Sequence, residues 1–311
     1  MSESSPGRLT SIADAVMQAL PGWRLVGGPE PFGWAPRRHL RARLERGAER
    51  QQVVLRQSWT EAGHRREALL YQSVLPHLGL VTARLLATFE LAEGGPPWSV
   101  LEDLGTCHVV PTDAGDRAAL LEALGALHAE SRKVLRDRPE VAAALARFAA
   151  SSPLHQRWQA LVERAGANPD TGIEPWHGRF LSQTLQRLDE EEVTLVHGDL
   201  DLTNTLLTAR GLALIDWEQA CIGPPSLDLG AVVEVLESRE ELESYQAAFC
   251  AAGGRALTDE QVQQWRDLGD AYDCFRWICY HLGEREAARD PGEQWREAYY
   301  YPRLRRLRSL A

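Results

Sequence analysis

One segment of this chain places two carboxylates and an amide at spacings suited to phosphate chemistry. Asp199 is followed by Asn204 and then by Asp216, in the stretch VHGDLDLTNTLLTARGLALIDWE. Phosphoryl transfer from ATP needs one carboxylate that orients the attacking hydroxyl, with amide and carboxylate oxygens that hold magnesium on the phosphates. Asp199 is therefore the candidate base. Asn204 and Asp216 are the candidate magnesium ligands, because Mg²⁺ prefers hard oxygen donors.

Short apolar runs on either side of these residues predict the strands that position them. The runs are Thr194–Val196, Leu206–Leu207 and Leu212–Ile215. His197 is predicted to fix the loop through hydrogen bonds and not to react. A buried polar turn is one alternative, and the three acid and amide residues at this spacing disfavour it. A metallohydrolase site built on His197, Asp199 and Asp216 is another, and it is disfavoured because the nearby sequence supplies no further histidines.

The motif HGDL-x3-N followed by IDWE resembles that of the aminoglycoside phosphotransferase and choline kinase group, which has a protein-kinase-like fold. The resemblance implies an α+β fold with two lobes: a small antiparallel-sheet lobe over residues 1–101, a connector over 102–105 and a larger, mostly helical lobe over 106–311. Asp228, in GPPSLDLG, resembles the family aspartate that braces the catalytic loop. The alternative for Asp228 is an N-cap of a helix that begins near Leu229.

The small lobe departs from the family at the residue expected to contact the phosphates. The family has a lysine on a strand here, whereas the matching strand QQVVLRQSW has Arg56, and the one lysine of the chain, Lys133, lies outside this lobe. Arginine keeps the charge but is larger and less compact. Glu67, on the following helix, is the candidate partner of Arg56. Its alternative is an exposed glutamate paired with neighbouring arginines.

Two further segments are candidates for nucleotide binding. Gly27 and Gly28 begin a glycine-containing loop whose backbone N–H groups would lie over the phosphates, although an ordinary turn fits it equally well. The resemblance implies that the connector binds adenine through backbone groups, which points by position to Glu102, Asp103 and Leu104.

Periodicity and turn residues predict the remaining elements. Helices are expected over Ser11–Leu20, Glu61–Leu75, Asp116–Leu135, Leu227–Cys250, Thr258–Leu282 and Gly292–Leu310, and over Pro139–Leu188 with a break around Gly166–Pro175. Strands are expected over Trp23–Val26, His39–Leu44, Gln52–Gln57, Leu80–Leu91 and Trp98–Leu101.

Composition limits the class of protein. The chain has 311 residues, with 34 Lys and Arg against 44 Asp and Glu, so its formal net charge is −10. This charge argues against a nucleic-acid partner and is compatible with a cationic small substrate. No apolar run is long enough for a membrane span, and no signal peptide is recognised. Five cysteines without metal-binding spacing are expected to be free thiols in a cytoplasmic protein.

These observations predict a kinase that uses Mg²⁺ and ATP to phosphorylate a hydroxyl of a small molecule, and the resemblance suggests an aminoglycoside. GTP is not excluded as the donor, and choline, homoserine or a sugar remain alternative acceptors. A nucleotide-binding, pseudokinase-like module without transfer activity is the alternative from another class. Carboxylates in residues 231–243, with Asp270 and Asp273, fit a site for ammonium groups or, more simply, a solvated helix face. The sequence does not indicate the oligomeric state.

Overall fold

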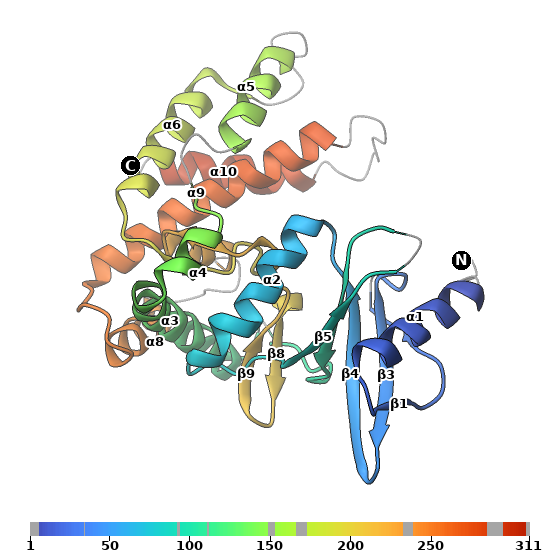
Figure 1. Ribbon diagram of the computed structural model, residues 1–311. Helices are drawn as coiled ribbons and strands as arrows, with labels where there is room; N and C mark the ends of the chain where they lie inside the picture. The colour runs from blue at the N-terminus through green and yellow to red at the C-terminus, as the bar shows by residue number, and fades with distance from the viewer. Residues whose placement is uncertain are drawn as a thin grey trace.

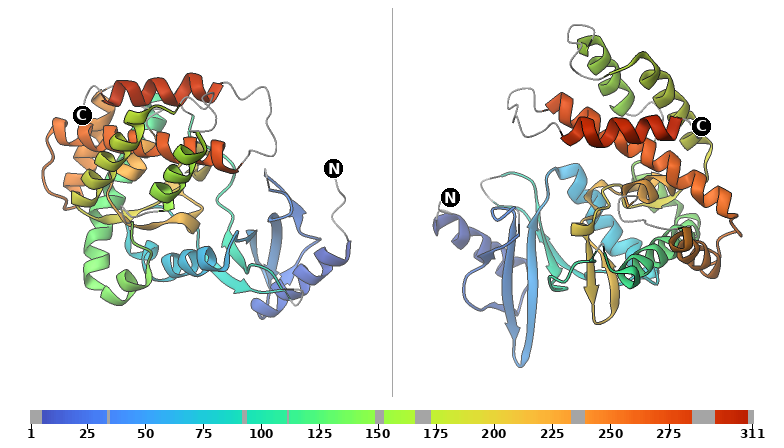
Figure 2. Two further views of the ribbon diagram at one scale, coloured as in Figure 1. Left: turned by 90° about the horizontal axis from the view of Figure 1, so that it is seen from above. Right: turned by 180° about the vertical axis from the view of Figure 1, so that it is seen from behind.

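The computed structural model describes residues 6–33, 35–91, 94–110, 112–148, 153–165, 173–232, 239–284 and 295–308. The chain forms two lobes (Figure 1). An antiparallel sheet with helix α1 packed against it makes the small lobe, and helices make most of the large one. Views from above and from behind show the same separation (Figure 2).

The small lobe is a curled antiparallel sheet with strand order β1-β3-β4-β6-β5, and β2 pairs with β3. Its apolar side chains alternate along the central strands and pack against Ile12 and Val16 of α1, which explains why these strands form one core. The elements are α1 (Pro6–Ala19), β1 (Arg24–Leu25), β2 (Glu30–Pro31), β3 (His39–Arg46), β4 (Glu49–Gln57), β5 (Leu85–Phe89) and β6 (Trp98–Glu102).

Helix α2 (Glu61–Ser73) lies between this sheet and the large lobe (Figure 1). The Oγ1 of Thr60 caps the helix by accepting the N–H of Gly63 at 2.9 Å. A short 3₁₀ helix, η1 (Leu75–His77), follows it. The next residues do not continue the strand predicted over Leu80–Leu91. Val81 instead pairs with Ala213 of the large lobe, so only Leu85–Phe89 joins the sheet.

The large lobe contains two packed groups of helices. Leu120, Leu124 and Leu127 of α3 belong to the main core together with Tyr245 and Phe249 of α8. Helices α5, α6, α9 and α10 share a second core. The bounds are α3 (Ala114–Asp137), α4 (Pro139–Ala144), α5 (Pro153–Ala165), α6 (Pro175–Glu190), α7 (Ser226–Ala231), α8 (Arg239–Ala251), α9 (Asp259–Glu284) and α10 (Trp295–Arg308).

The single helix predicted over Leu227–Cys250 is wrong, because α7 ends at Ala231 and α8 begins at Arg239. Residues 233–238, with part of the predicted acidic run, lie outside the described residues.

Short strands and turns between the helices hold the predicted motif. Strand β7 pairs with β10, and β8 and β9 form a hairpin beside α2 (Figures 1 and 2). These elements are β7 (Thr194–Val196), η3 (Leu202–Asn204), β8 (Thr205–Thr208), β9 (Gly211–Leu214), η4 (Trp217–Gln219) and β10 (Cys221–Gly223). All five cysteines are free thiols. Of the helices in the described ranges, none is both long and apolar enough to span a bilayer.

Candidate active site

The loop after β7 is held from below by the carboxylate of Asp228. Its Oδ2 accepts the backbone N–H of His197 at 2.8 Å, and its Oδ1 accepts that of Gly198 at 3.0 Å. Asp228 lies inside α7, and Pro225 holds the N-cap position, so the alternative role of Asp228 as an N-cap is wrong. Its carboxylate faces the loop and not the start of its own helix.

Gly198 is required by the shape of this loop. It has a φ of +77°, and a Cβ there would lie 2.5 Å from the carbonyl oxygen of Gln219. The Nε2 of His197 lies 2.8 Å from the carbonyl oxygen of Ile215, which ties the loop to the end of the β8–β9 hairpin. His197 is fully buried. Its hydrogen bond to Ile215 agrees with the structural role that the sequence suggests for it.

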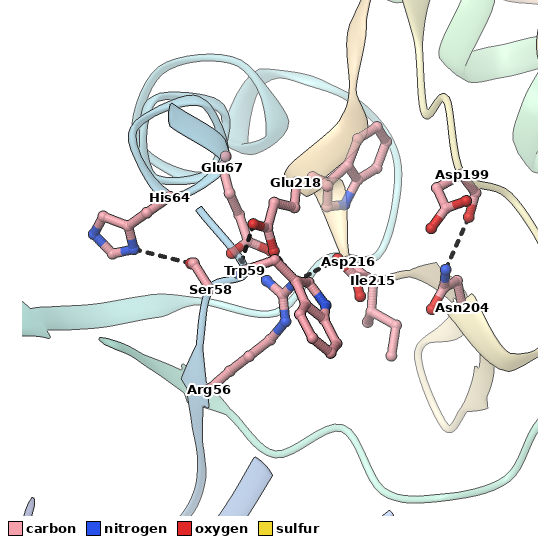
Figure 3. A network of polar contacts seen from close by, with 12 residues as sticks. Arg56, Ser58, Trp59, His64, Glu67, Asp199, Asn204, Ile215, Asp216 and Glu218 are labelled. Atoms are coloured by element: carbon pink, nitrogen blue, oxygen red, sulfur yellow. Dashed lines mark hydrogen bonds and ion pairs between the residues drawn. The ribbon is translucent and has the colours of Figure 1, made fainter. Parts of the chain in front are cut away.

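Asp199 and Asn204 are joined by a hydrogen bond across the loop (Figure 3). The Asn204 Nδ2 donates to the backbone carbonyl of Asp199 at 2.8 Å. The amide nitrogen therefore faces the loop, and the amide oxygen Oδ1 points away from this bond. Asp201 shapes the turn between them, because its carboxylate accepts the N–H groups of Thr203 at 2.6 Å and Asn204 at 3.1 Å. The side chain of Asp201 therefore has a local structural role.

Asp216 lies immediately after the hairpin, in an unusual conformation. Its φ of 67° makes it the one non-glycine with positive φ among the described residues. Such a conformation is costly for an L-residue and is found most often where a functional site requires it. The carboxylate of Asp216 and the amide oxygen of Asn204 are hard oxygen donors of the kind that suits Mg²⁺, and these two residues would hold it.

Arg56 is buried among three carboxylates from both lobes (Figure 3). Its Nη1 donates to Glu67, and its Nη2 donates to Asp216 and, at 2.8 Å, to Glu218. Burial by itself lowers the pKa of Arg56, but these three negative charges outweigh it and raise the pKa above its ordinary value. Burial raises the pKa of Glu67, and the Arg56 guanidinium opposes that rise. Glu67 is thus a buried partner of Arg56 and not an exposed helix glutamate.

Sequence reasoning missed Arg276, which reaches the loop from α9. Its Nη1 donates to the carbonyl of Gly198 at 3.0 Å and lies 3.6 Å from the Oδ1 of Asp199, and its Nη2 lies 3.1 Å from Asp273. Partial burial raises the pKa of Asp199 above its ordinary value, and Arg276 opposes this rise. No motif surrounds this arginine, so the sequence carried no signal for its role.

His128, on α3, was missed for the same reason. It is fully buried, with its Nε2 at 3.1 Å from Asp228 and its Nδ1 at 2.9 Å from the hydroxyl of Tyr245. Its apolar surroundings in LLEALGALHAE read as an ordinary core helix. The contact connects the centre of the large lobe to the carboxylate that supports the loop.

Two of the carboxylates considered for an acceptor site are ion-paired inside the large lobe. Asp270 pairs with Arg303 and Asp273 with Arg276, and both acids are buried. Neither Asp270 nor Asp273 belongs to a solvated helix face. A polar groove of about 630 Å³ between α6 and α9 is lined by none of the candidate active-site residues.

The remaining nucleotide-binding candidates lie at the edges of the small lobe. Gly27 and Gly28 follow β1, and a Cβ added to either would meet open space. Glu102 ends β6 and Asp103 follows it, and their side chains pair with Arg210 and Arg41. Their N–H groups bond to the carbonyls of Arg84 and Gln52. Leu104 follows them and packs partly against the main core.

Two lobes, a braced Asp-x4-Asn loop and a buried cation–glutamate pair define a protein-kinase-like protein. The model of the phosphotransferase enzyme family (APH) matches residues 31–268, well over half of the chain, and the chain belongs to this family. A thiamine kinase from Salmonella paratyphi B is 36% identical over 107 residues. That match covers 33% of this chain and 36% of the thiamine kinase, about a third of each.

Solved structures of similar fold cover nearly the whole chain. A macrolide 2′-phosphotransferase from Brachybacterium faecium has a TM-score of 0.60 at 18% identity and covers 95% of this chain and 98% of its own. A choline kinase from Streptococcus pneumoniae has a TM-score of 0.60 at 16% identity, covering 98% of both chains. A GDP and kanamycin complex of an aminoglycoside phosphotransferase has a TM-score of 0.57 at 14% identity, covering 96% and 98%.

Proposed function

We propose that this protein is a magnesium-dependent small-molecule kinase that transfers the γ-phosphate of ATP to a hydroxyl group. The observation that carries the proposal is the arrangement of Asp199, Asn204 and Asp216. The amide of Asn204 is fixed by the carbonyl of Asp199, and the strained Asp216 follows the adjoining hairpin. Membership of the phosphotransferase family supports this reading.

Each residue then has a distinct role. Asp199 accepts a hydrogen bond from the acceptor hydroxyl and orients it toward the phosphate. Asn204 and Asp216 hold Mg²⁺, which when bound neutralises charge on the phosphates. Arg56, held by Glu67, steadies the phosphates that are not transferred. Catalysis on this scheme is mainly positioning and charge neutralisation.

We assign nucleotide binding to the region where the small lobe faces the loop of Asp199. The N–H groups of Glu102 and Asp103 are bonded within the small lobe, whereas within the described chain no bond to the N–H of Leu104 is found. The adenine base would therefore bind to the Leu104 N–H and the neighbouring carbonyls, in the connector expected over residues 102–105. Gly27 and Gly28 would lie on the phosphate side.

For the acceptor we propose an alcohol that carries a cationic nitrogen. Choline and thiamine, the substrates in the names of two similar proteins, share this chemistry, and kanamycin carries amino groups on its sugar rings. The net charge of −10 favours such molecules over anionic acceptors. An aminoglycoside is one member of the class, homoserine is a zwitterionic member that also carries a carboxylate, and neutral sugars serve as comparisons.

The second candidate function is a nucleotide-binding module without transfer activity, and the observation that favours it is Arg56 in the position of the family lysine. One assay separates the two. ADP or GDP release from Mg-ATP or Mg-GTP is measured with thiamine, choline, aminoglycosides, a macrolide, homoserine and sugars, and Asp199→Asn is the blank. Acceptor-dependent release that disappears in the variant supports the kinase. Nucleotide binding without release on any acceptor supports the module.

A further inference from the structure

Glu218 has every oxygen of its carboxylate bound by the small lobe. Its Oε1 accepts the backbone N–H groups of Trp59 at 2.7 Å and Thr60 at 3.0 Å, just before α2 begins. Its Oε2 accepts Arg56 Nη2 at 2.8 Å (Figure 3). Glu218 is 1% exposed and lies in η4, two residues after Asp216. Its carboxylate therefore connects the two lobes.

Helix α2 is shaped to receive this side chain. A Cβ on Gly63 would lie 2.2 Å from the Glu218 Cγ, so any larger residue there would displace the glutamate or the helix. The Nη1 of Arg66, one turn further on, donates to the backbone carbonyl of Glu218 at 2.5 Å. The same turn of α2 also carries Glu67, the other partner of Arg56.

Arginine at position 56 makes contacts that a lysine cannot reproduce together. Its two terminal nitrogens point in different directions. Nη1 forms an ion pair with Glu67, and Nη2 forms ion pairs with Asp216 and Glu218. Lysine has a single ammonium group and no fork. A lysine could pair with Glu67 or approach Asp216, but the buried Oε2 of Glu218 would lose its charged donor, which is costly in a buried site.

We propose that Glu218 is a positioning residue that, together with Arg56, clasps the start of α2 to the segment carrying Asp216, and that the site is therefore adapted to arginine at position 56. The clasp fixes the Arg56–Glu67 pair and Asp216 in one arrangement through a shared guanidinium. Its effect on transfer rests on the proposed kinase function, whereas its effect on stability does not.

The test is a double-mutant cycle with Arg56→Lys, Glu218→Gln and the double variant. The glutamine keeps an oxygen for the two backbone N–H groups but removes the charge that Arg56 matches. Urea unfolding without nucleotide or metal, ATP affinity by calorimetry, and kcat and KM are measured for each protein. Glu61→Gln, at an exposed position of α2, is the matched control in both backgrounds.

In the wild-type background, Glu218→Gln is expected to lower the urea midpoint and to reduce kcat about 10-fold or more. In the Arg56→Lys background, the effect of Glu218→Gln on the urea midpoint and on kcat is expected to be less than half as large, or to reverse. Arg56→Lys alone is expected to reduce kcat, and it keeps the Glu67 pair that the fold needs.

Equal effects of Glu218→Gln in both backgrounds would overturn the clasp, as would a gain in kcat or stability from Arg56→Lys. If no acceptor supports turnover in any variant, the unfolding cycle still decides: coupling in the urea midpoints supports the clasp while the kinase function fails, and additive midpoints reject the clasp. If Glu218→Gln does not fold, Arg56→Lys alone still tests the proposal. A reduced kcat in this variant supports the clasp, and a gain in kcat or stability overturns it.

Discussion

The carboxylate of Asp228 accepts the backbone N–H of His197 at 2.8 Å, although 31 residues separate them. The same group accepts the N–H of Gly198 and contacts His128, so three donors converge on one fully buried carboxylate. Burial alone raises the pKa of Asp228, but the hydrogen bonds from His128 and His197 outweigh it and hold the pKa below its ordinary value. The ionised form therefore supports the loop of Asp199.

We expect Asp228→Asn to destabilise the fold by about 2–4 kcal/mol, because its amide would direct N–H groups at the N–H donors of the loop. Turnover should fall as well, since Asp199 follows directly on Gly198. Urea unfolding and kcat check this, with the exposed Asp137→Asn as the control. Wild-type stability in Asp228→Asn would show that the backbone bonds do not support the loop.

Asp199→Asn should abolish transfer and leave the fold and nucleotide affinity intact. The side chain is half exposed, so its charge contributes little to folding. Loss of a general base typically reduces rates by about 10²–10⁴-fold. Steady-state kinetics and calorimetry with Mg-ATP measure the two effects separately. A variant with normal turnover would remove Asp199 from the mechanism.

Asp216→Asn should weaken the dependence on magnesium in a way that Asp199→Asn does not. The substitution removes the carboxylate from the oxygen set that it forms with Asn204, so the Mg²⁺ concentration for half-maximal rate should rise at least about 10-fold. Magnesium titrations of the rate at saturating nucleotide measure this, and chelation with EDTA should stop transfer in the wild type. An unchanged titration curve would place the metal elsewhere.

The sequence predicted the residues that lie within one motif and failed on those that reach it from distant helices. Asp199, Asn204 and Asp216 could be proposed from their spacing within one short stretch, and Arg56 and Glu67 from the family resemblance of a strand and the helix that follows it. Arg276 and His128 come from α9 and α3, where a single polar residue in a helix looks like any other. The left-handed backbone of Asp216 was also hidden, because nothing but its tertiary contacts imposes it.

Arg276→Gln should reduce kcat by about 10–100-fold with little change in the KM for nucleotide, because its guanidinium fixes the Gly198 carbonyl and lies beside Asp199. Arg276→Lys should recover part of the loss, since it keeps the charge without the fork. Arg266→Gln, on the same helix and paired with the neighbouring Asp267, is the control. A loss expressed in nucleotide KM alone would assign Arg276 to nucleotide binding.

Glu191 should make stability fall as pH rises through neutrality. Its Oε1 is buried with no hydrogen-bond partner among the residues that the structure describes, and its Oε2 accepts the hydroxyl of Ser226. Burial raises the pKa of Glu191 to about 8, against an ordinary value near 4.5. Between these values the folded state holds a proton that the unfolded state releases, so this group's contribution to the free energy of unfolding declines with rising pH.

Glu191→Gln removes that titration while keeping a hydrogen-bonding oxygen for Ser226. Its urea midpoint should match the wild type near pH 5 and exceed it at pH 8, because the variant has no carboxyl group whose ionisation favours the unfolded state. Glu190→Gln, the exposed neighbour, should leave the pH profile unchanged. A wild-type pH slope in Glu191→Gln would mean that Glu191 ionises normally and that the buried oxygen finds a donor as the pH rises.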